Sequence, residues 1–572
     1  MKDTIRLHAS VLSASLVLVL LIGVGVDFST AQDQSRLAVQ AAVANTIGRK
    51  IVPDQRAHLS TAAKNRLYLA ESGALNRVNP SPLAQQPVRR LLASRLARTA
   101  ATGVNPVPVN DANFDFLLSR LAGFTQNGSS NAWCGHNIVV GYNDSASLLL
   151  TSALGTSFSF SGVAVSHDSG ISFQASLFMG AGADPANFLA GEPVVACAGN
   201  DFYYASLFDF TGPIDPTTGL PIPFTGVGVN RSRNGGDAWS APVAAVKKNE
   251  DEHLVDKEWL TVDPKNPENL YLTYTDFDFS FKKANGCNGG VRVAIELVTS
   301  NNGGVGWSKP VVVDQLCSPA FGQMLQGSQV VVGNAGEIYV AWIAETTTDG
   351  QIFFGRSTDG GVTFSQPISV GSATLAGLGG DGRLQSLVQG NSFPTMSVDR
   401  SKGPSRGTLY LAWTDASANQ IPDFLAPTGS YGFGDVVLSR STDKGRTWTP
   451  AKVVNHAPGI FAGSGRDQFL PSAAVDNEGT LAICYFDRRR DLENNGVDHY
   501  CSISHDQGTT LTSVRHTAKS FAPTHSTDGL VDPVSFGDYD GVSSDASGAS
   551  TGFFSSFQTQ ASGNPDIVGV RF

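Results

Sequence analysis

Acidic, guanidinium and tyrosine side chains gather in this sequence where short apolar runs begin or end. The candidate catalytic residues are Asp487, Glu258, Asp276, Tyr539 and Asp538. The candidate substrate-binding residues are Arg488, Arg489, Arg466, Arg383, Asp415, Gln468 and Asn143. Side chains of these types can transfer protons and can recognise hydroxyl or carboxylate groups.

Each group has a chemistry that it could perform and a plainer alternative. Two carboxylates such as Glu258 and Asp276 can act as general acid and general base across a glycosidic bond when their separation suits. Arg488 and its neighbours present guanidinium groups of the kind that bind carboxylate or sulfate. Tyr539 and Tyr485 stand beside carboxylates, as a tyrosine nucleophile would. Salt bridges between neighbouring sheets, a solvated charge run and packed aromatic rings are the alternatives.

A repeated octapeptide indicates the elements that must position these residues. Its pattern is Ser-x-Asp/Asn-x-Gly-x-x-aromatic, and copies begin at residues 166, 232, 300, 357, 441 and 504, with Leu511 closing the last copy. The pattern predicts a hairpin turn in which the Asp or Asn accepts backbone N–H bonds and the glycine takes a positive φ. We therefore interpret the acids of the repeat as structural.

A second recurring unit, a strand, a turn and a strand ending near an acid, lies between the copies. Clear examples are 257–277, 391–416 and 469–489. Seven such pairs with six copies of the octapeptide predict an all-β fold, a propeller of seven blades, with six as the alternative. The run 566–572 would lack an outer neighbour, which residues ahead of Asn131 could supply. The inner strands of each blade would bring the candidate residues to one mouth of a central channel.

Composition and charge divide the 572-residue chain into three parts. Residues 1–31 have the basic, apolar and small-residue regions of a cleaved signal peptide, so we expect a secreted, periplasmic or cell-surface protein without a transmembrane domain. Residues 32–123 are basic and rich in Ala and Arg, and predict a helical or disordered segment: a propeptide, a basic arm docked on the acidic body, or a disordered spacer. Residues 124–572 are the propeller. The net charge of −10 argues against nucleic acid as a partner, and we expect a monomer.

The six cysteines and the acidic turns raise two further questions. Export permits disulfides, and we expect Cys484 to pair with Cys501 and Cys287 with Cys317, with free buried thiols as the alternative. We expect no cofactor and no transition-metal site. Turns at 276–279 and 538–541 offer oxygen ligands that could take Ca²⁺.

The octapeptide copies STDGGVTF and STDKGRTW, with strands such as YLAWTD between them, resemble the Asp-box (BNR-repeat) sialidase-like propellers. The segments TQNGSSNAWCGHNIVVGYNDS, DKEWLTVDP, YFDRRRD and GDYDG are similar to secreted bacterial proteins of that superfamily, over about residues 124–572. The resemblance implies a glycan or polysaccharide as ligand. Sialidases of this fold are six-bladed and carry an Arg-Ile-Pro motif, an arginine triad and a Tyr–Glu pair. Here no Arg-Ile-Pro precedes Ser166, and no arginine lies between Arg120 and Ser166.

Three functions follow as hypotheses. The first is a sialidase-like exo-glycosidase, which would be a glycoside hydrolase acting at the mouth. The second is a non-catalytic propeller that binds glycans or proteins. The third is a polysaccharide lyase. The fold alone does not choose among them, because one propeller hosts many chemistries.

Overall fold

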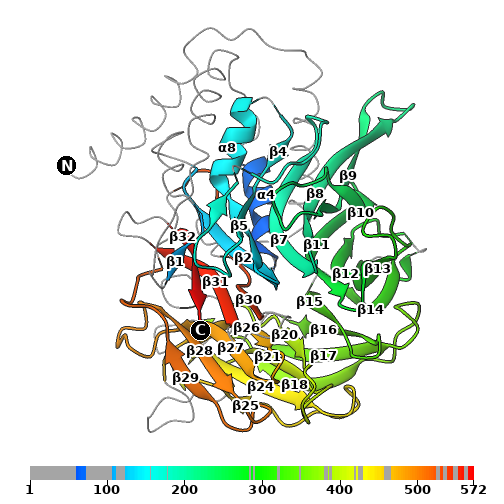
Figure 1. The fold of residues 1–572 in the computed structure, drawn as a ribbon. Helices are drawn as coiled ribbons and strands as arrows, with labels where there is room; N and C mark the ends of the chain where they lie inside the picture. The colour runs from blue at the N-terminus through cyan, green and yellow to red at the C-terminus, as the bar shows by residue number, and fades with distance from the viewer. Residues whose placement is uncertain are drawn as a thin grey trace, which may run out of the picture.

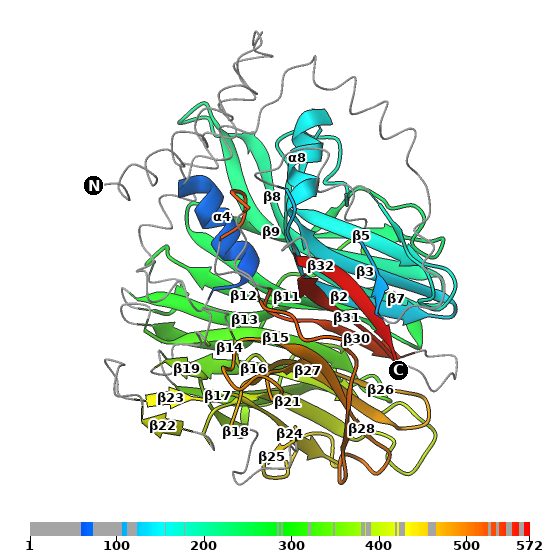
Figure 2. The same ribbon diagram turned by 90° about the vertical axis from the view of Figure 1, so that its left-hand side faces the viewer.

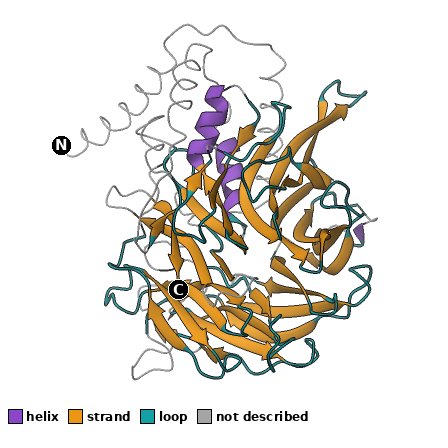
Figure 3. Ribbon diagram, viewed as in Figure 1, coloured by secondary structure: helices purple, strands orange, loops and turns teal. Residues whose placement is uncertain are grey.

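The computed structural model is almost entirely β-sheet (Figure 3). It describes residues 59–71, 106–110, 123–154, 156–176, 178–282, 285–287, 290–318, 322–346, 349–378, 384, 390–417, 420–422, 430–455, 465–523, 528–532, 537–544, 552–559 and 565–572. Within these ranges there are two α-helices, α4 (Thr61–Glu71) and α8 (Ser145–Leu154). The signal peptide expected at 1–31 lies outside the described residues, so export stays a prediction. None of the helices described has the length and apolar character needed to cross a membrane.

Seven sheets of four or more strands form the blades of a propeller (Figure 1). From the axis outward, blade 1 consists of β2 (Gln126–Cys134), β3 (Asn137–Asp144), β5 (Ser161–Ser166) and β6 (Gln174–Ala175). Blade 2 consists of β7 (Phe188–Ala198), β8 (Asp201–Ile214), β9 (Pro221–Ser232) and β10 (Val243–Asn249), with β4 (Phe158–Ser159) beside β7. Blade 3 consists of β11 (His253–Asp263), β12 (Asn266–Asp278), β13 (Val291–Ser300) and β14 (Val311–Ser318).

The remaining four blades repeat the plan, and a small extra sheet lies outside them. Their strands are: blade 4, β15 (Met324–Val332), β16 (Ile338–Glu345), β17 (Asp349–Ser357) and β18 (Ile368–Thr374); blade 5, β20 (Thr395–Val398), β21 (Leu409–Asp415), β24 (Asp435–Ser441) and β25 (Lys452–Val453); blade 6, β26 (Gln468–Val475), β27 (Leu481–Asp487), β28 (Asp498–Ser504) and β29 (Thr512–Arg515); blade 7, β30 (Gly541–Ser544), β31 (Gly552–Thr559), β32 (Pro565–Arg571) and β1 (Val107–Pro108); the extra sheet, β19 (Gly377–Leu378), β23 (Ser430–Gly432) and β22 (Gln420–Pro422). The prediction of seven blades is confirmed.

The ring is closed by a strand from the N-terminal side of the chain. Val107 pairs with Gly569 and Pro108 with Val568, so β1 is the outermost strand of blade 7. The innermost strands contact one another in the order β2, β7, β11, β15, β20, β26, β30 and back to β2. Closure of this kind joins the last blade to the first and leaves only the short outer edges of the blades unpaired. The outer strand does come from ahead of Asn131, as expected, but from within the stretch 32–123.

The repeated octapeptide forms the turn that its sequence predicts. In the copy at 357, the Ser357 hydroxyl donates to Asp359 Oδ1 at 2.6 Å and accepts from Gly361 N at 2.9 Å. Asp359 Oδ1 also accepts from Thr363 N at 3.0 Å. Gly361 has φ +90°, which only glycine adopts without strain. Each turn therefore satisfies its own backbone groups and joins the third and fourth strands of a blade.

Large side chains and disulfides hold the blades to one another. Trp342 of β16 and Trp413 of β21 are wholly buried between sheets. The expected disulfides Cys287–Cys317 and Cys484–Cys501 are both present. A third, Cys134–Cys197, joins the ends of β2 and β7 and so links blades 1 and 2. The alternative of free thiols is wrong, because all six cysteines are paired.

Candidate functional site at the hub

Five of the seven innermost strands carry the same β-bulge. In each, two residues face one residue of the next strand, at the register shifts Asn127/Ser130, Gly191/Val194, Asp256/Trp259, Gln326/Gln329 and Phe469/Ser472. The first bulged residue has a left-handed backbone in every case: Gly128 (φ +57°), Glu192 (+55°), Lys257 (+50°), Gly327 (+62°) and Leu470 (+51°). A residue with a Cβ at such a φ costs about 1–3 kcal/mol relative to an unstrained one. Strain of this size suggests that the side chains of Glu192 and Lys257 are needed where they lie.

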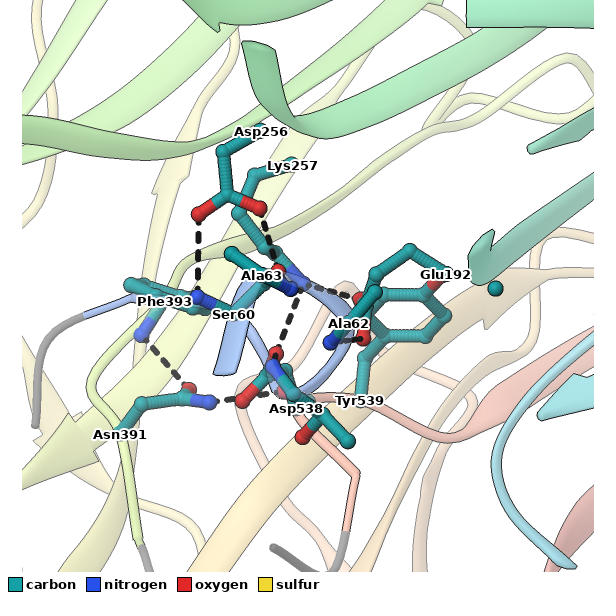
Figure 4. Close-up of polar contacts among 12 residues, drawn as sticks. Ser60, Ala62, Ala63, Glu192, Asp256, Lys257, Asn391, Phe393, Asp538 and Tyr539 are labelled. Atoms are coloured by element: carbon teal, nitrogen blue, oxygen red, sulfur yellow. Dashed lines mark hydrogen bonds and ion pairs between the residues drawn. The ribbon is translucent and has the colours of Figure 1, made fainter. Parts of the chain in front are cut away.

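Glu192 and Lys257 form a buried ion pair across blades 2 and 3. Lys257 Nζ lies 3.2 Å from Glu192 Oε2 and 3.8 Å from Asp538 Oδ2. The same ammonium lies over the ring of Tyr539 at 4.0 Å and over that of Phe393 at 5.1 Å. A desolvated cation is stabilised by carboxylates and by aromatic faces together. We call Glu192, Asp256, Lys257, Glu258, Asp538 and Tyr539 the hub cluster, and Figure 4 labels all of these residues except Glu258.

The N-terminus of α4 is bound to this cluster. Ser60 N donates to Asp256 Oδ2 at 3.0 Å, Thr61 N to Asp538 Oδ2 at 2.5 Å, and Ala62 N to Glu192 Oε1 at 3.2 Å. The first N–H groups of a helix have no partner within it, and its dipole favours negative charge at this end. Three carboxylates from three blades therefore cap one helix (Figure 4). The Ser60 hydroxyl adds the usual N-cap bond, accepting from Ala63 N at 3.0 Å.

The rest of α4 is seated by charge and by apolar contact. Arg66 Nη2 lies 2.6 Å from Asp209 Oδ1 and donates to Thr225 Oγ1 at 3.1 Å, and Arg66 lies 3.8 Å from Glu250. Leu67 is buried against blades 3 and 4. Figures 1 and 2 both place α4 beside the inner strands, on the side of the ring where α8 also lies. The helix α4 thus covers the hub, although the hub residues that it contacts follow it by more than a hundred residues in the chain.

Glu258 has an unusual environment within the cluster. Its side chain is 1% exposed, and neither carboxylate oxygen has a hydrogen-bond partner among the described residues. Burial raises its pKa well above the ordinary value, and the neighbouring Glu192 raises it further. Burial also raises the pKa of Glu192, to about 7, against the opposing effect of Lys257. The surroundings of Glu258 therefore favour its neutral acid form, whereas Lys257 favours the ionised form of the neighbouring Glu192.

A small cavity adjoins these groups. It measures about 20 Å³ and is lined by Lys257, Glu258, Trp259, Gly327, Ser328, Gln329, Asn391, Phe393, Pro394, Thr395, Leu470, Pro471, Asp538 and Tyr539. A space of this size holds about one water molecule. This cavity has no room for a sugar.

The two tyrosines expected as nucleophile candidates are packed donors. The Tyr539 hydroxyl donates to the carbonyl of Pro193 at 2.9 Å, and its ring meets Trp259 edge-on. Burial raises the pKa of Tyr539 well above 10. Tyr485 is buried too, with its hydroxyl 2.9 Å from the hydroxyl of Ser502. Both phenols are held in the protonated form.

The arginines expected to bind substrate lie in a separate cluster on blade 6. Arg488 is fully buried, and its Nη1 donates to Asp467 Oδ2 at 3.2 Å. Arg489 Nε donates to Asp487 Oδ2 at 2.7 Å, and Gln468 Nε2 donates to Asp487 Oδ1 at 3.2 Å. These groups fix the strand ends of blade 6 to the loops beside them.

Of the other predicted site residues, two have hydrogen-bond partners elsewhere and one lies outside the described residues. Arg466 Nε donates to the carbonyl of Asp491 at 3.0 Å. Asp415 accepts from Thr374 N at 2.8 Å. Arg383 lies outside the described residues.

Asp276 is separated from its expected partner Glu258. It lies in a charge network with Lys248 Nζ at 3.1 Å, His253 Nδ1 at 2.9 Å and Arg292 Nη1 at 3.3 Å. Its pKa lies below the ordinary value: burial, the largest effect, works to raise it, but the hydrogen bond from His253 and the charge of Lys248 together outweigh burial. The structure thus places the two carboxylates in different clusters.

Of the remaining candidates, Asn143 belongs to the hub. Its Oδ1 accepts from Glu192 N at 2.8 Å, which supports the strained residue. Sequence reasoning missed Asp256 and Asn391, and although it allowed a helical segment and a docked basic arm within 32–123, it did not place either at 61–71. Asn391 Nδ2 donates to the carbonyl of Asp538 at 2.9 Å. The position of Asp256 directly before Lys257 and Glu258 was the available signal.

The turns considered for Ca²⁺ are occupied by protein contacts. Asp276 has the basic partners above, and Asp538 is bound by α4. Asp278 accepts from Ser280 N at 2.8 Å, and Asp540 accepts from the Ser556 hydroxyl at 3.0 Å. Across the described ranges, no three His, Cys, Asp or Glu residues form a group that could hold a metal ion.

Fold and site together define a seven-bladed β-propeller with a charged, helix-capped hub. No protein-family model and no curated protein sequence matches the chain. Solved structures resemble it weakly. A protein of unknown function from Dyadobacter fermentans is 13% identical, with a TM-score of 0.41 over 82% of this chain and 97% of that one.

Two further solved structures are of enzymes. An alpha-L-arabinanase of Penicillium chrysogenum is 10% identical, with a TM-score of 0.43 over 82% of this chain and 98% of that one. A leech intramolecular trans-sialidase is 10% identical, with a TM-score of 0.37 over 83% of this chain and 98% of that one.

Proposed function

We propose that this chain is an exported glycan-active protein that hydrolyses glycosidic bonds at the hub. The observation that carries the proposal is the pair Glu258 and Glu192. Burial without a hydrogen-bond partner favours the protonated form of Glu258, whereas Lys257 favours the ionised form of Glu192. Two carboxyl groups whose environments separate their protonation states are the arrangement of an acid-catalysed glycoside hydrolase.

In this mechanism Glu258 donates its proton to the glycosidic oxygen as the bond to the sugar breaks. The carboxylate of Glu192 or Asp538 stabilises the positive charge that develops on the sugar ring. A water molecule then adds to the anomeric carbon and gives one proton back to Glu258, which completes the hydrolysis. Lys257 holds both carboxylates in place, since its ammonium is within 3.8 Å of each. Hydroxyl groups of the sugar would take the places of the N–H donors of α4 on the carboxylates.

A sialidase-like activity is the finer form of this proposal, and the resemblance in the sequence motivates it. It requires guanidinium groups that can meet a substrate carboxylate. Arg488 and Arg489 are instead paired with Asp467 and Asp487. Sialosides therefore belong among the test substrates, together with neutral glycosides.

A non-catalytic glycan-binding propeller is the second candidate. The internal pairing of the blade 6 arginines and the helix over the hub favour it, because neither leaves an open catalytic pocket. Binding of glycans without product would support this candidate. A polysaccharide lyase would be recognised by the ultraviolet absorbance of an unsaturated uronide.

The test compares Glu258→Gln with Glu493→Gln, a control at an exposed glutamate on blade 6. Aryl glycosides and sialosides with good and poor leaving groups are assayed, on the whole chain and after one engineered cut between Glu71 and Val107. We expect Glu258→Gln to lower kcat by about 10²–10⁴ for poor leaving groups and less for good ones, because loss of a general acid depends on the leaving group. An equal loss for both, or none, would contradict the assignment.

A further inference from the structure

We propose that α4 is an intramolecular ligand of the hub, which occupies the glycan site and must leave before a glycan binds. This inference rests on the proposed function, because it concerns access to the same site. It makes residues 59–71 an inhibitory segment of this chain.

The first support is the chemistry of the contacts. Asp256, Asp538 and Glu192 each accept one backbone N–H of the first turn. A sugar offers the same kind of donor through its hydroxyl groups, and an amino sugar offers N–H groups. The hub cluster holds four carboxyl groups and one ammonium group, so it suits a ligand rich in hydrogen-bond donors, and α4 supplies three backbone N–H groups.

The second support is the carboxyl group that α4 leaves unused. Glu258 adjoins the three capped carboxylates, is 1% exposed, and has both oxygens without a partner among the described residues. A buried polar group without a partner is costly unless it serves a ligand. The small cavity that Glu258 lines, about 20 Å³, is far below the roughly 300 Å³ of a small-molecule pocket. Because α4 already occupies Asp256, Asp538 and Glu192, the seated helix and a sugar bound to these carboxylates exclude one another.

The third support is the way the ring is closed. The closing strand β1 begins at Val107, which follows α4 in the chain. In the described residues α4 pairs with no strand, so it takes no part in any blade sheet. A single cut between Glu71 and Val107 would therefore separate α4 from the propeller without opening the ring.

Charge makes the interaction specific. Arg66 meets Asp209 at 2.6 Å and Glu250 at 3.8 Å, at the outer end of the hub. Lys64 is buried, and the carboxylates of Asp538 and Asp532 partly offset the effect of burial, which lowers its pKa. A basic helix on an acidic mouth binds by complementary charge as well as by its first turn.

The experiment uses the full chain with a site for a sequence-specific protease inserted between Glu71 and Val107. Glycan hydrolysis and glycan binding are measured before and after cleavage, and a synthetic peptide of residues 59–71 is then added back. We expect cleavage to raise the rate at least tenfold and the peptide to reverse the rise. A peptide carrying Arg66→Ala should need a concentration at least tenfold higher to reverse the rise in rate. In the uncut chain, Arg66→Ala should raise the rate, whereas Arg446→Ala, at an exposed arginine on blade 5, should not.

Each outcome separates this inference from the proposed function. An uncut chain as active as the cut one, with no effect of the peptide, overturns the inference and leaves the proposed function standing. A cut chain that releases and rebinds the peptide, with Trp259 fluorescence as the readout, but that neither binds nor hydrolyses glycans overturns the proposed function. Loss of the fold on cleavage, seen by circular dichroism, would show that α4 is part of the scaffold and would overturn the inference.

Discussion

The ion pair at the centre of the hub gives the sharpest prediction. Lys257→Met removes the ammonium and keeps a side chain of similar length, so that little cavity forms. Glu192 then loses the cation 3.2 Å away, and the rings of Tyr539 and Phe393 lose the charge that they face. Breaking a buried pair from one side costs about 3–5 kcal/mol of unfolding free energy.

The free energy of unfolding lost in the Lys257→Met variant should depend on pH. Lys257 lowers the pKa of Glu192, which burial has raised to about 7, so removing Lys257 raises that pKa further. Below this value the variant keeps Glu192 neutral and loses little. Above pH 7, Glu192 in the folded variant must either keep a proton that the unfolded chain has released or become a buried carboxylate without a cation partner. Both alternatives destabilise the folded state. The loss therefore grows as pH rises through 7.

Urea unfolding at pH 5.0 and 8.5, followed by tryptophan fluorescence, measures this loss. We expect about 1 kcal/mol or less at the lower pH and about 3–5 kcal/mol at the higher one. The double variant Lys257→Met with Glu192→Gln should recover most of the loss at pH 8.5, because it leaves no unpaired charge on residue 192. Equal losses at both pH values, or no recovery in the double variant, would refute the reasoning.

Three further outcomes are expected. Burial raises the pKa of Glu250 to about 8, above its value in the unfolded chain, so the free energy of unfolding should fall as pH rises from 5 to 9. Glu250→Gln should flatten this pH dependence in calorimetry. An unchanged slope would count against the role of Glu250. Replacing Cys134 and Cys197 by alanine should cost about 4 kcal/mol in urea unfolding, since their disulfide closes 63 residues of chain, and a loss under about 1 kcal/mol would be inconsistent with this. Ser357→Ala removes the hydroxyl that organises one hairpin turn and should cost about 1–2 kcal/mol without altering glycan turnover, and a changed rate would place the turn in the site.

The fold was open to prediction because its signals are local. A turn such as 357–364 satisfies its own hydrogen bonds, so its sequence alone specifies it. Repetition of that turn, with strand pairs between the copies, then requires a closed ring, since open sheet edges are unfavourable. The pairing of Cys484 with Cys501 follows from the same logic, because neighbouring strands of one blade place them opposite each other.

The site was only partly open to prediction. The acids at the inner strand ends were recognised as a group, but the sequence does not show which of them share a cluster. Glu258 and Asp276 lie on paired strands, yet the bulge at Lys257 and the cations around Asp276 put them in different environments. Likewise, the sequence shows Arg488 as a charged residue, and only the packing shows that Asp467 already holds it.

The sequence by itself indicated the ring of hairpins, favoured seven blades over six and pointed to two of the disulfides, because each depends on residues close together in the chain or on a regular repeat. Only the tertiary structure decided what lies at the hub. The pKa of Glu258, the strain at Lys257 and the capping of α4 by three blades all arise from groups more than a hundred residues apart or from burial among them. Burial and long-range contact set the energy of a charge, and neither can be read from the residues beside it in the chain.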